Sequence, residues 1–499
     1  MLHRPMLVAA MGAAVIAIII CAERRRNNRK REQVDRKHKS PLPETTEEKN
    51  VDGITAASSV RLAADAGELL AICRLRWLVY VGELKRQNYA YVDHVRHILE
   101  DPLDHVPGVQ NLYIALPAAD AESGRVVDLG EGLLPDGVGD SEALSLQAVG
   151  CVRVHVPCPT KYDSLFSMGD ARVWGTFASQ PSAFAFFSRF MVHARHRGKG
   201  HGGGLGFADQ LYVAAAVAAR HAGARFLLLN CTPALAPLYE ARGFVRYKPA
   251  CWDDAMGLQV PMALVLDDLA FLRRSDPNGP VTAAVRDLAA SSSPPAGFPD
   301  PAACRWLSKL LDERPAVLVS SRCHDVEALR RFVDARGIEF SHMALFSGVG
   351  EAERTELLTR CPGAMSVLDV LPNTLISRKG DVRDESFLVL RGSVDVDGGI
   401  ETLASGAVVG ESAFLSGEQR VCTIRVTGGE GSTPGRDDAA EGGALLLCTS
   451  RVGFQKAMRV VPAIAVKLLW NMATGLSKKV SEEPARSDRR ARRLASRAC

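Results

Sequence analysis

The stretch Ser188-Arg-Phe-Met-Val-His-Ala-Arg195-His-Arg-Gly198-Lys-Gly200 decides the fold of the first half of the chain. It begins as a strand-like run, ends in Arg-x-x-Gly-x-Gly and continues into a helix-forming segment from Leu205 to Ala222. Glycines at such a place let backbone N–H groups at a helix N-terminus point toward a phosphate. The pattern predicts a site for the pyrophosphate of coenzyme A or the phosphopantetheine of a carrier protein. The expected donor contacts are Met191, His193, Arg195, Arg197, Gly198, Lys199 and Gly200.

A second element follows about thirty residues later. Arg225-Phe-Leu-Leu-Leu-Asn230 reads as a buried strand, and the segment from Ala236 to Phe244 reads as a short helix that ends at Gly243. In this order and at this spacing the two elements resemble the acyl-CoA-binding half of GNAT-fold N-acyltransferases. The resemblance implies a pantetheine arm held between two separating parallel strands. It also implies that Tyr239 protonates the leaving thiolate.

Further matches are similar to one branch of that superfamily, the long-chain N-acyl amino acid synthases and autoinducer synthases. They begin upstream, with Arg76-Trp-Leu-Val-Tyr80-Val-Gly-Glu83-Leu and Asp101-Pro-Leu-Asp104 before an apolar strand at Leu112 to Leu116. These families take fatty acyl groups from carrier proteins or from coenzyme A. The resemblance spans roughly Arg61 to Arg273 and implies an α+β fold, a mixed sheet with flanking helices. Its other strands are Gly150–Val154, Ser188–Phe190 and Val260–Leu266.

One departure concerns the proton acceptor. Autoinducer synthases carry a glutamate on the central strand, where this chain has Phe186 and Phe187. The base is then His193, a water chain or a residue from elsewhere. Simple N-acylation is therefore expected rather than lactone synthesis.

Acyl transfer from a thioester to an amine needs a neutral amine, a polarised carbonyl and a proton for the departing sulfur. Arg76, Arg153 and Arg189 are expected to bind the carboxylate of an amino-acid acceptor, because a guanidinium group matches a carboxylate with two hydrogen bonds. Structural alternatives stay open for each residue. The arginines can be ion-pair partners, Tyr239 a packed aromatic side chain, and His193 a structural histidine.

The second half changes to many short strands with turn signals, typical of a small jelly roll. Its segment Gly410-Glu411-Ser-Ala413-Phe-Leu-Ser-Gly-Glu-Gln-Arg420-Val-Cys-Thr423 resembles the phosphate-binding cassette of cyclic nucleotide-binding domains. The match runs from about Ser341 to Val480, with a closing helix from Val461 to Leu476. It implies a glutamate for the ribose and an arginine for the cyclic phosphate of cAMP or cGMP. The expected contacts are Gly410, Glu411, Ser412, Ala413, Arg420 and Val421.

Three neighbours of that arginine depart from the family pattern, namely Gln419, Val421 and Cys422. Valine at 421 lacks the hydroxyl that contacts phosphate or purine, which leaves the choice between cAMP and cGMP open. The alternative is a jelly roll that only packs or dimerises.

The N-terminus suggests a membrane anchor. Met6 to Ala22 is an apolar run of 17 residues, at the short limit of a membrane-spanning helix. Glu23 to Lys39 follows with nine Lys and Arg against three acidic residues, which places the body of the chain on the cytoplasmic side. A cleaved signal peptide is the alternative. A second basic stretch, Arg486 to Arg497, is suited to anionic lipid headgroups.

Composition limits the kinds of binding partner that we expect for this chain. The net charge is +4, and the basic stretch contributes nine minus three, or +6, so the remaining residues sum to −2 and predict no nucleic-acid surface. Twelve cysteines without a Cys-x-x-Cys pair predict reduced thiols and no metal site. The oligomeric state is left open. The expected regions are a membrane anchor (1–22), a basic stalk (23–60), the transferase (61–273), a linker rich in Pro and Ser with connecting helices (274–340), the nucleotide-binding domain (341–480) and a basic tail (481–499).

The sequence thus predicts a membrane-anchored N-acyltransferase regulated by cyclic nucleotide. One alternative is an acetyl-CoA-dependent protein lysine acetyltransferase. The other is a non-catalytic sensor whose two domains only bind ligands.

Overall fold

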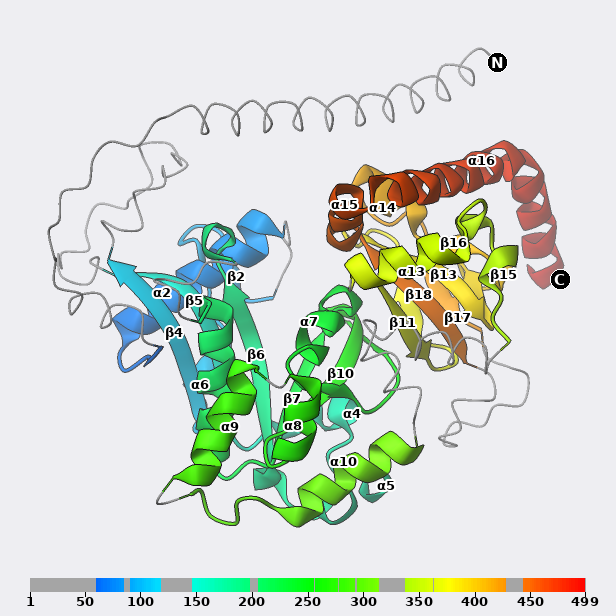
Figure 1. Ribbon diagram of the computed structural model, residues 1–499. Coiled ribbons are helices and arrows are strands. Elements are labelled where there is room, and N and C mark those ends of the chain that lie inside the picture. The colour runs from blue at the N-terminus through cyan, green and yellow to red at the C-terminus, as the bar shows by residue number, and fades with distance from the viewer. Residues whose placement is uncertain are drawn as a thin grey trace, which may run out of the picture. The chain divides into compact units, whose positions relative to one another are not determined.

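The computed structural model describes residues 60–84, 90–117, 146–197, 205–254, 256–276, 278–291, 294–313, 337–361, 363–427 and 443–498, without the side chains of 483–498 (Figure 1). Residues 60–476 belong to one compact unit. No helix within the described ranges is long and apolar enough to cross a membrane. The expected anchor, Met6 to Ala22, and the basic stretch after it lie outside these ranges.

The first half is built on one eight-stranded sheet of order β1-β4-β5-β6-β7-β10-β8, with β9 paired to β10. All pairs are antiparallel except β6 with β7. The strands are β1 (Arg61–Leu62), β4 (Val109–Pro117), β5 (Leu146–His155), β6 (Phe184–Val192), β7 (Phe226–Cys231), β8 (Val245–Arg246), β9 (Cys251–Asp253) and β10 (Gly257–Val265). A small hairpin pairs β2 (Val92–Asp93) with β3 (Ile98–Leu99).

Helices flank this sheet as the α+β expectation requires (Figure 1). Helix α6 (Phe207–His221) buries Phe207, Leu211, Ala215 and Ala219, and this spacing of four residues puts them on one face of the helix. The other helices are α2 (Ala66–Trp77), continued by a π-helical segment (Leu78–Glu83), and α4 (Asp163–Phe166), α5 (Ala171–Trp174), α7 (Ala236–Glu240), α8 (Leu269–Ser275), α9 (Pro280–Ala290) and α10 (Pro301–Glu313).

Helices occupy part of the region 274–340, where the sequence predicts a linker with connecting helices. Within it α9 folds and buries Val281 and Val285 in the core of the sheet domain. In α10, the Trp306 ring stacks on Trp174 at 4.7 Å, and its indole N–H donates to the Val173 carbonyl at 2.6 Å. The Pro, Ser and Ala content suggested a flexible segment, but the apolar side chains of these helices have a core to pack against.

The second half contains two four-stranded antiparallel sheets, β11-β18-β13-β16 and β12-β17-β14-β15. This arrangement agrees with the expected jelly roll. The strands are β11 (Met365–Val370), β12 (Leu375–Ser377), β13 (Glu385–Arg391), β14 (Ser393–Val396), β15 (Glu401–Ala404), β16 (Val408–Val409), β17 (Ile424–Val426) and β18 (Ala444–Ser450).

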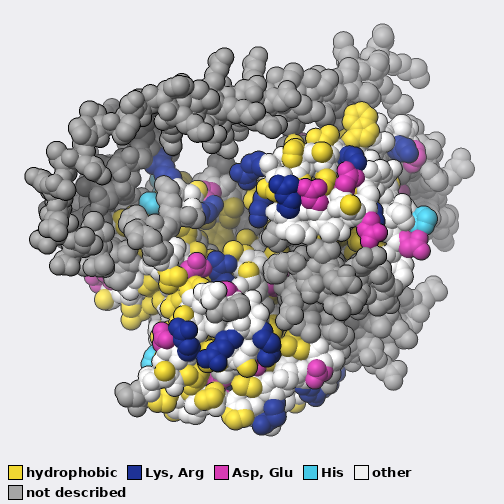
Figure 2. Space-filling model, in the orientation of Figure 1, with side chains coloured by type: hydrophobic (Ala, Val, Ile, Leu, Met, Phe, Trp, Pro, Cys, Tyr) yellow, Lys and Arg dark blue, Asp and Glu magenta, His cyan; other side chains and the backbone are white. Residues whose placement is uncertain are grey.

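Four helices accompany these sheets: α13 (Glu351–Arg360), α14 (Glu411–Ser416), α15 (Arg451–Val460) and α16 (Pro462–Ala498). The closing helix expected from Val461 to Leu476 is therefore longer than predicted and continues through the basic tail. It packs through Ile464, Leu468 and Met472, which recur every four residues. On the face drawn in Figure 2, basic and acidic side chains lie among one another.

Inside the unit 60–476, strands of the two halves meet. The Ala250 N–H donates to the Asp369 carbonyl at 2.9 Å, and the Arg246 guanidinium donates to the Val367 carbonyl. Arg246 is buried and also donates to the Glu240 carboxylate at 2.5 Å. A chain of polar contacts thus runs from β11 to α7.

Candidate functional site

The central feature of the first half is the point where β6 and β7 separate. These parallel strands pair at Phe184–Phe226, Ala185–Leu227 and Phe186–Leu228, and then β6 continues to Val192 and β7 to Cys231. Strands that stop pairing leave backbone N–H and C=O groups that need other partners. The amides of a pantetheine arm are suitable partners, as the sequence resemblance implied.

The predicted donor turn begins directly after β6. His193, Arg195 and Arg197 lie there, in and around a short 3-10 turn (Ala194–His196), and Arg195 and Arg197 are exposed at the surface. Glu83 fixes this turn, because its carboxylate accepts from the Ala194 N–H at 3.0 Å and from the Arg197 guanidinium. Met191 is buried on β6. Gly198, Lys199 and Gly200 lie outside the described residues.

His193 is suited to accept a proton. Partial burial lowers its pKa, and Arg195 and Arg197 add to this, while Glu83 opposes it. A lowered pKa keeps the imidazole neutral at pH 7, which is the form a base requires. The His193 Nε2 atom lies 4.0 Å from a Glu83 carboxylate oxygen.

The three arginines expected to bind the acceptor gather around two aspartates. Arg76 on α2 donates to Asp104 at 2.5 Å, and Arg153 on β5 contacts Asp104 at 3.1 Å and Asp101 at 3.0 Å. Arg189 on β6 donates to Asp101 at 2.7 Å. Burial opposes ionisation of both aspartates, but the arginines outweigh it and hold both pKa values below the usual range.

The three arginines of this cluster differ in their burial and in their other contacts. Arg76 is fully buried, and a second nitrogen of its guanidinium donates to the Asn111 side chain at 2.9 Å, so both ends are used by the protein. Arg153 likewise donates to the Ser188 hydroxyl at 3.0 Å. Arg189 keeps 9% side-chain exposure and lies over the Tyr80 ring at 5.6 Å. Among the described residues, this cluster therefore brings three guanidinium groups together around two carboxylates.

Arg189 also has an unusual backbone. Its φ is +54°, and the register of β5 with β6 shifts between Cys151 and Arg153. A left-handed φ is uncommon for a residue other than glycine, and a bulge in a strand redirects the side chain. This places Arg189 beside the separated end of β6 and β7 and makes it the strongest of the three candidates to contact an acceptor.

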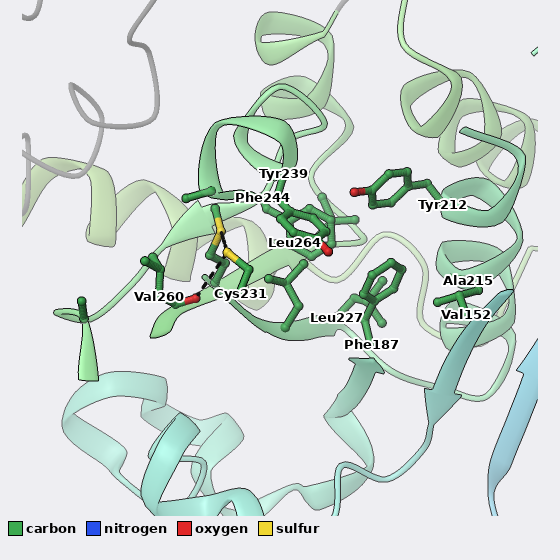
Figure 3. Close-up of a cluster of buried hydrophobic side chains, with 14 of the residues drawn as sticks. Val152, Phe187, Tyr212, Ala215, Leu227, Cys231, Tyr239, Phe244, Val260 and Leu264 are labelled. Atoms are coloured by element: carbon green, nitrogen blue, oxygen red, sulfur yellow. Dashed lines mark hydrogen bonds between the residues drawn. The ribbon is translucent and has the colours of Figure 1, made fainter. Parts of the chain in front are cut away.

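Tyr239 on α7 lies in an aromatic cluster with 6% exposure (Figure 3). Its ring is 5.6 Å from Phe244, 5.8 Å from Tyr212 and 6.2 Å from Phe187, measured between centroids. Burial raises its pKa well above the ordinary value, so it holds its proton at neutral pH as a general acid must. The packing role that the sequence left open for Tyr239 is therefore present in the structure.

Two buried polar atoms near this cluster were missed by the sequence reasoning. The Asn230 Oδ1 atom on β7 and the Tyr212 hydroxyl on α6 have no hydrogen-bond partner among the described residues. Asn230 had a signal, since it is the polar residue in the apolar strand Phe-Leu-Leu-Leu-Asn-Cys. Tyr212 had none, because an aromatic side chain on the buried face of a helix looks like any core residue.

In the second half, the cassette is assembled around Arg420. Gly410 has a φ of +78°, and a Cβ there would lie 2.3 Å from an Arg420 nitrogen, so a side chain would displace the arginine. Glu411 and Ala413 are buried, Ser412 is partly exposed, and Val421 is 64% exposed. The exposure of Val421 agrees with a position that faces a ligand or solvent.

Neighbouring groups of the protein bind the Arg420 guanidinium. Its guanidinium donates to the Gly410 carbonyl at 2.8 Å and the Glu385 carbonyl at 2.6 Å, and lies 3.6 Å from the Glu385 carboxylate. Burial lowers the pKa of Arg420 and raises that of Glu385. The buried Nε atom of Arg420 has no partner among the described residues. Sequence reasoning missed Glu385, although a glutamate beside Ser386-Phe-Leu-Val-Leu was a visible signal.

No family model matches the chain, and no curated protein matches it. Among solved structures it is similar to FeeM, an N-acyl amino acid synthase from uncultured soil microbes, at 13% identity over 44% of this chain and 96% of that one, with a TM-score of 0.28. It is similar to TofI in a complex with an inhibitor and MTA, at 15% identity over 45% and 99%, with a TM-score of 0.28. It is also similar to a cyclic nucleotide-binding domain from Methylobacillus flagellatus, at 18% identity over 26% and 71%, with a TM-score of 0.22.

The similar structures are of the two kinds that the sequence resemblance named, an acyl-transferring synthase and a cyclic nucleotide-binding domain. These identities and TM-scores say nothing about activity, so the function is argued from the side chains of the two sites.

Proposed function

We propose that this chain is an N-acyltransferase that moves an acyl group from a coenzyme A or carrier-protein thioester to an amine, under control of a cyclic nucleotide. The observation that carries the proposal is the separation of β6 from β7 with Tyr239 and Arg189 beside it. These features supply a place for the donor arm, an acid for the sulfur and a cation for an acceptor carboxylate.

The proposed reaction needs no cofactor beyond the donor. The neutral amine attacks the thioester carbon, and the carbon–nitrogen bond forms as the carbon–sulfur bond breaks. His193 or water takes the proton that the nitrogen loses, and the Tyr239 hydroxyl gives a proton to the sulfur. Backbone N–H groups at the separated strands would stabilise the oxygen anion of the intermediate.

The acceptor is proposed to be a small amine with a carboxylate, such as an amino acid. The support is the gathering of three guanidinium groups at this site and the partial exposure of Arg189. A charge-assisted pair with a carboxylate would be strong in this buried setting.

Control by cAMP or cGMP is proposed from the second half. A cyclic phosphate would compete with the Glu385 carboxylate for Arg420 and would find the unpartnered Nε atom. The contact chain from the Val367 carbonyl through Arg246 to Glu240 ends next to Tyr239 in sequence and offers a path from β11 to the acid. Regulation requires that the nucleotide bind two arrangements of this path with different affinity.

Membrane attachment through Met6 to Ala22, with both domains on the cytoplasmic side, is a separate proposal based on the sequence alone. It suits a hydrophobic donor or product. Fractionation of cells that express the full chain or a chain starting at Val60 tests it. The full chain is expected in the membrane pellet after a salt wash, and recovery of the full chain in the supernatant would contradict the proposal.

One observation favours a non-catalytic alternative. Phe186 and Phe187 are buried where autoinducer synthases carry a glutamate, so β6 contributes no carboxylate base. A protein that only binds an acyl donor and a nucleotide would not need a carboxylate base on β6.

The test is mass spectrometry of lipid extracts from cells that express the wild-type chain or the Gly198→Ala/Gly200→Ala variant. We expect an N-acylated amine with the wild type that is absent with the variant, because the sequence motif makes these two glycines expected donor contacts. Equal extracts from both strains would favour protein acetylation or the non-catalytic alternative.

A further inference from the structure

The proposed reaction leaves a negative charge on the Tyr239 oxygen, among apolar side chains. When Tyr239 gives its proton to the sulfur, a tyrosinate forms among Leu227, Leu264 and Phe244, which are all buried (Figure 3). An isolated buried anion costs several kcal/mol relative to water unless a hydrogen bond or a cation compensates it. A second group must therefore stabilise this oxygen for Tyr239 to act as an acid.

Tyr212 is placed to do this. Its side chain is 1% exposed, its ring lies 5.8 Å from that of Tyr239 at 82°, and its hydroxyl points toward Tyr239 in Figure 3. Burial raises the pKa of both hydroxyls, and their mutual contact lowers the pKa of Tyr212 and raises that of Tyr239, the directions expected when Tyr239 is the donor. The Tyr212 oxygen has no other partner among the described residues, so its donor capacity is unused.

The Tyr212 ring is held rigidly. It stacks on Phe187 with centroids 5.5 Å apart and planes at 7°, and it contacts Phe190 at 4.4 Å. Phe187 and Phe190 belong to the part of β6 that has separated from β7. Strand β6, which would bind the acyl donor, therefore also fixes the direction of the Tyr212 hydroxyl.

A cation, the Arg242 guanidinium, lies over the Tyr212 ring. The Arg242 guanidinium lies 4.8 Å from the centre of the Tyr212 ring and is fixed by two hydrogen bonds to Asp209, at 3.0 and 2.8 Å. Arg242 also donates to the Leu238 carbonyl at 2.9 Å, which ties it to the segment that carries Tyr239. A cation over the ring makes the Tyr212 hydroxyl a better hydrogen-bond donor.

We infer that Tyr212 is a positioning residue for acyl transfer, which donates a hydrogen bond from its hydroxyl to the Tyr239 oxygen and stabilises the tyrosinate left after protonation of the sulfur. The inference rests on the proposed function. The proton balance closes, because the amine nitrogen releases one proton to His193 or water, the thiolate gains the Tyr239 proton, and water returns a proton to Tyr239. Tyr212 keeps its own proton throughout.

The test measures acyl transfer from dodecanoyl-CoA to hydroxylamine, a small amine that is neutral at pH 7, with the purified full chain. Tyr212→Phe removes the hydroxyl and keeps the ring. A hydrogen bond to a charged group contributes roughly 1.5–3 kcal/mol, so kcat is expected to fall about 10- to 100-fold with the KM for the donor little changed. Tyr247→Phe is the matched control, since this buried hydroxyl donates to the Phe166 carbonyl in a different cluster.

Two further readouts separate positioning from folding. In the Tyr239→Phe background, Tyr212→Phe is expected to cause no additional loss, because the oxygen it serves is gone. With the dodecanoyl thioester of thiophenol, whose thiol leaves without a proton, both single variants are expected to regain most of the wild-type rate. If Tyr212→Phe does not fold, Arg242→Gln keeps the hydroxyl, removes the cation and should show the same dependence on the leaving group.

The outcomes distinguish the inference from the proposed function. A slow Tyr239→Phe with an unchanged Tyr212→Phe would overturn the inference and leave the acid in place. A Tyr212→Phe loss that is equal in both backgrounds and with both donors would also overturn it, as a packing effect. Full activity of Tyr239→Phe would remove the acid assignment, and the absence of any acyl hydroxamate from the wild type would count against the proposed function.

Discussion

The two halves of the chain each bury an arginine site, and the two sites differ in how their carboxylates ionise. Asp101 and Asp104 have lowered pKa values, because three guanidinium groups outweigh the effect of burial. Glu385 has a raised pKa, because burial and the nearby Asp384 outweigh the effects of Arg420 and Arg383. The first site pairs its arginines with carboxylates that stay ionised, whereas the second pairs Arg420 with a carboxyl group whose pKa is raised.

The difference also gives the two sites opposite pH dependences. A carboxyl group with a lowered folded pKa contributes stability that is present above its unfolded pKa, about 3.8 for aspartate, and is lost as the pH falls. Glu385, with a raised folded pKa, contributes stability that is present below its unfolded pKa, about 4.5, and is lost as the pH rises through the raised value.

The largest effect is expected at the arginine cluster of the first site. Asp104→Ala removes the fully buried carboxylate that pairs with both Arg76 and Arg153. Removing one partner of a buried ion pair lowers the free energy of unfolding by roughly 3–5 kcal/mol. Urea denaturation measures the loss. Asp170→Ala is the control, because Asp170 pairs with the exposed Arg172, and such a pair is worth at most about 1 kcal/mol. Equal losses for the two variants would show that the cluster is not a scaffold.

The next effect is on nucleotide affinity. Arg420→Gln removes the cation that would meet the cyclic phosphate, and the loss of charge-assisted hydrogen bonds is expected to weaken cAMP or cGMP binding roughly 10- to 100-fold. Isothermal titration calorimetry measures the dissociation constants. Arg425→Gln, an exposed arginine on β17, should bind as the wild type does. Unchanged affinity in Arg420→Gln would mean that the cassette does not bind through this residue.

A smaller and opposite effect is expected at Glu385. Glu385→Gln removes the carboxylate that competes for Arg420, so nucleotide affinity should rise several-fold, and the stability lost by the wild type as the pH rises above about 4.5 should be retained. Chemical denaturation across this pH range, beside calorimetry, gives both values. Weaker binding in the variant would show that Glu385 orients Arg420 for the ligand rather than competing with it.

The smallest effect is expected on coupling. The double variant Glu240→Gln/Arg246→Met removes both charges of the buried pair, so neither is left alone, and it cuts the hydrogen bond to the Val367 carbonyl. Nucleotide binding should persist while its effect on the acyl-transfer rate shrinks toward none, from the 5- to 150-fold typical of coupled sites. Rates with and without cAMP, compared with the variant's own binding curve, test this, and an unchanged response would place the coupling elsewhere.

Local patterns in the sequence predicted much of this. The order of β6, α6, β7 and α7 was predicted correctly, because each has its own periodicity and its own glycine signals. The jelly roll was predicted from strand and turn spacing, and the structure has the two four-stranded antiparallel sheets that it requires. Composition alone could not predict that helix α9 of the linker region packs on the core of the sheet domain.

The ion pairs and the second tyrosine could not be predicted in the same way. Arg189 meets Asp101 across 88 residues of sequence, and Arg420 meets Glu385 across 35, so only the folded sheets bring them together. The arginines expected to clamp an acceptor were identified as a group, but their division into scaffold and contact depends on burial. Tyr212 becomes a candidate only once its hydroxyl is seen beside Tyr239 without a partner.

Nucleotide-controlled acyl transfer can be measured with the purified full chain, dodecanoyl-CoA and a mixture of amino acids, with and without cAMP. Products are identified by mass spectrometry for the wild type, for Arg189→Met and for the control Arg172→Met. The account predicts an N-acyl amino acid whose rate of formation changes with cAMP, falls sharply in Arg189→Met and is normal in Arg172→Met. No N-acyl product from the wild type under either condition would contradict it.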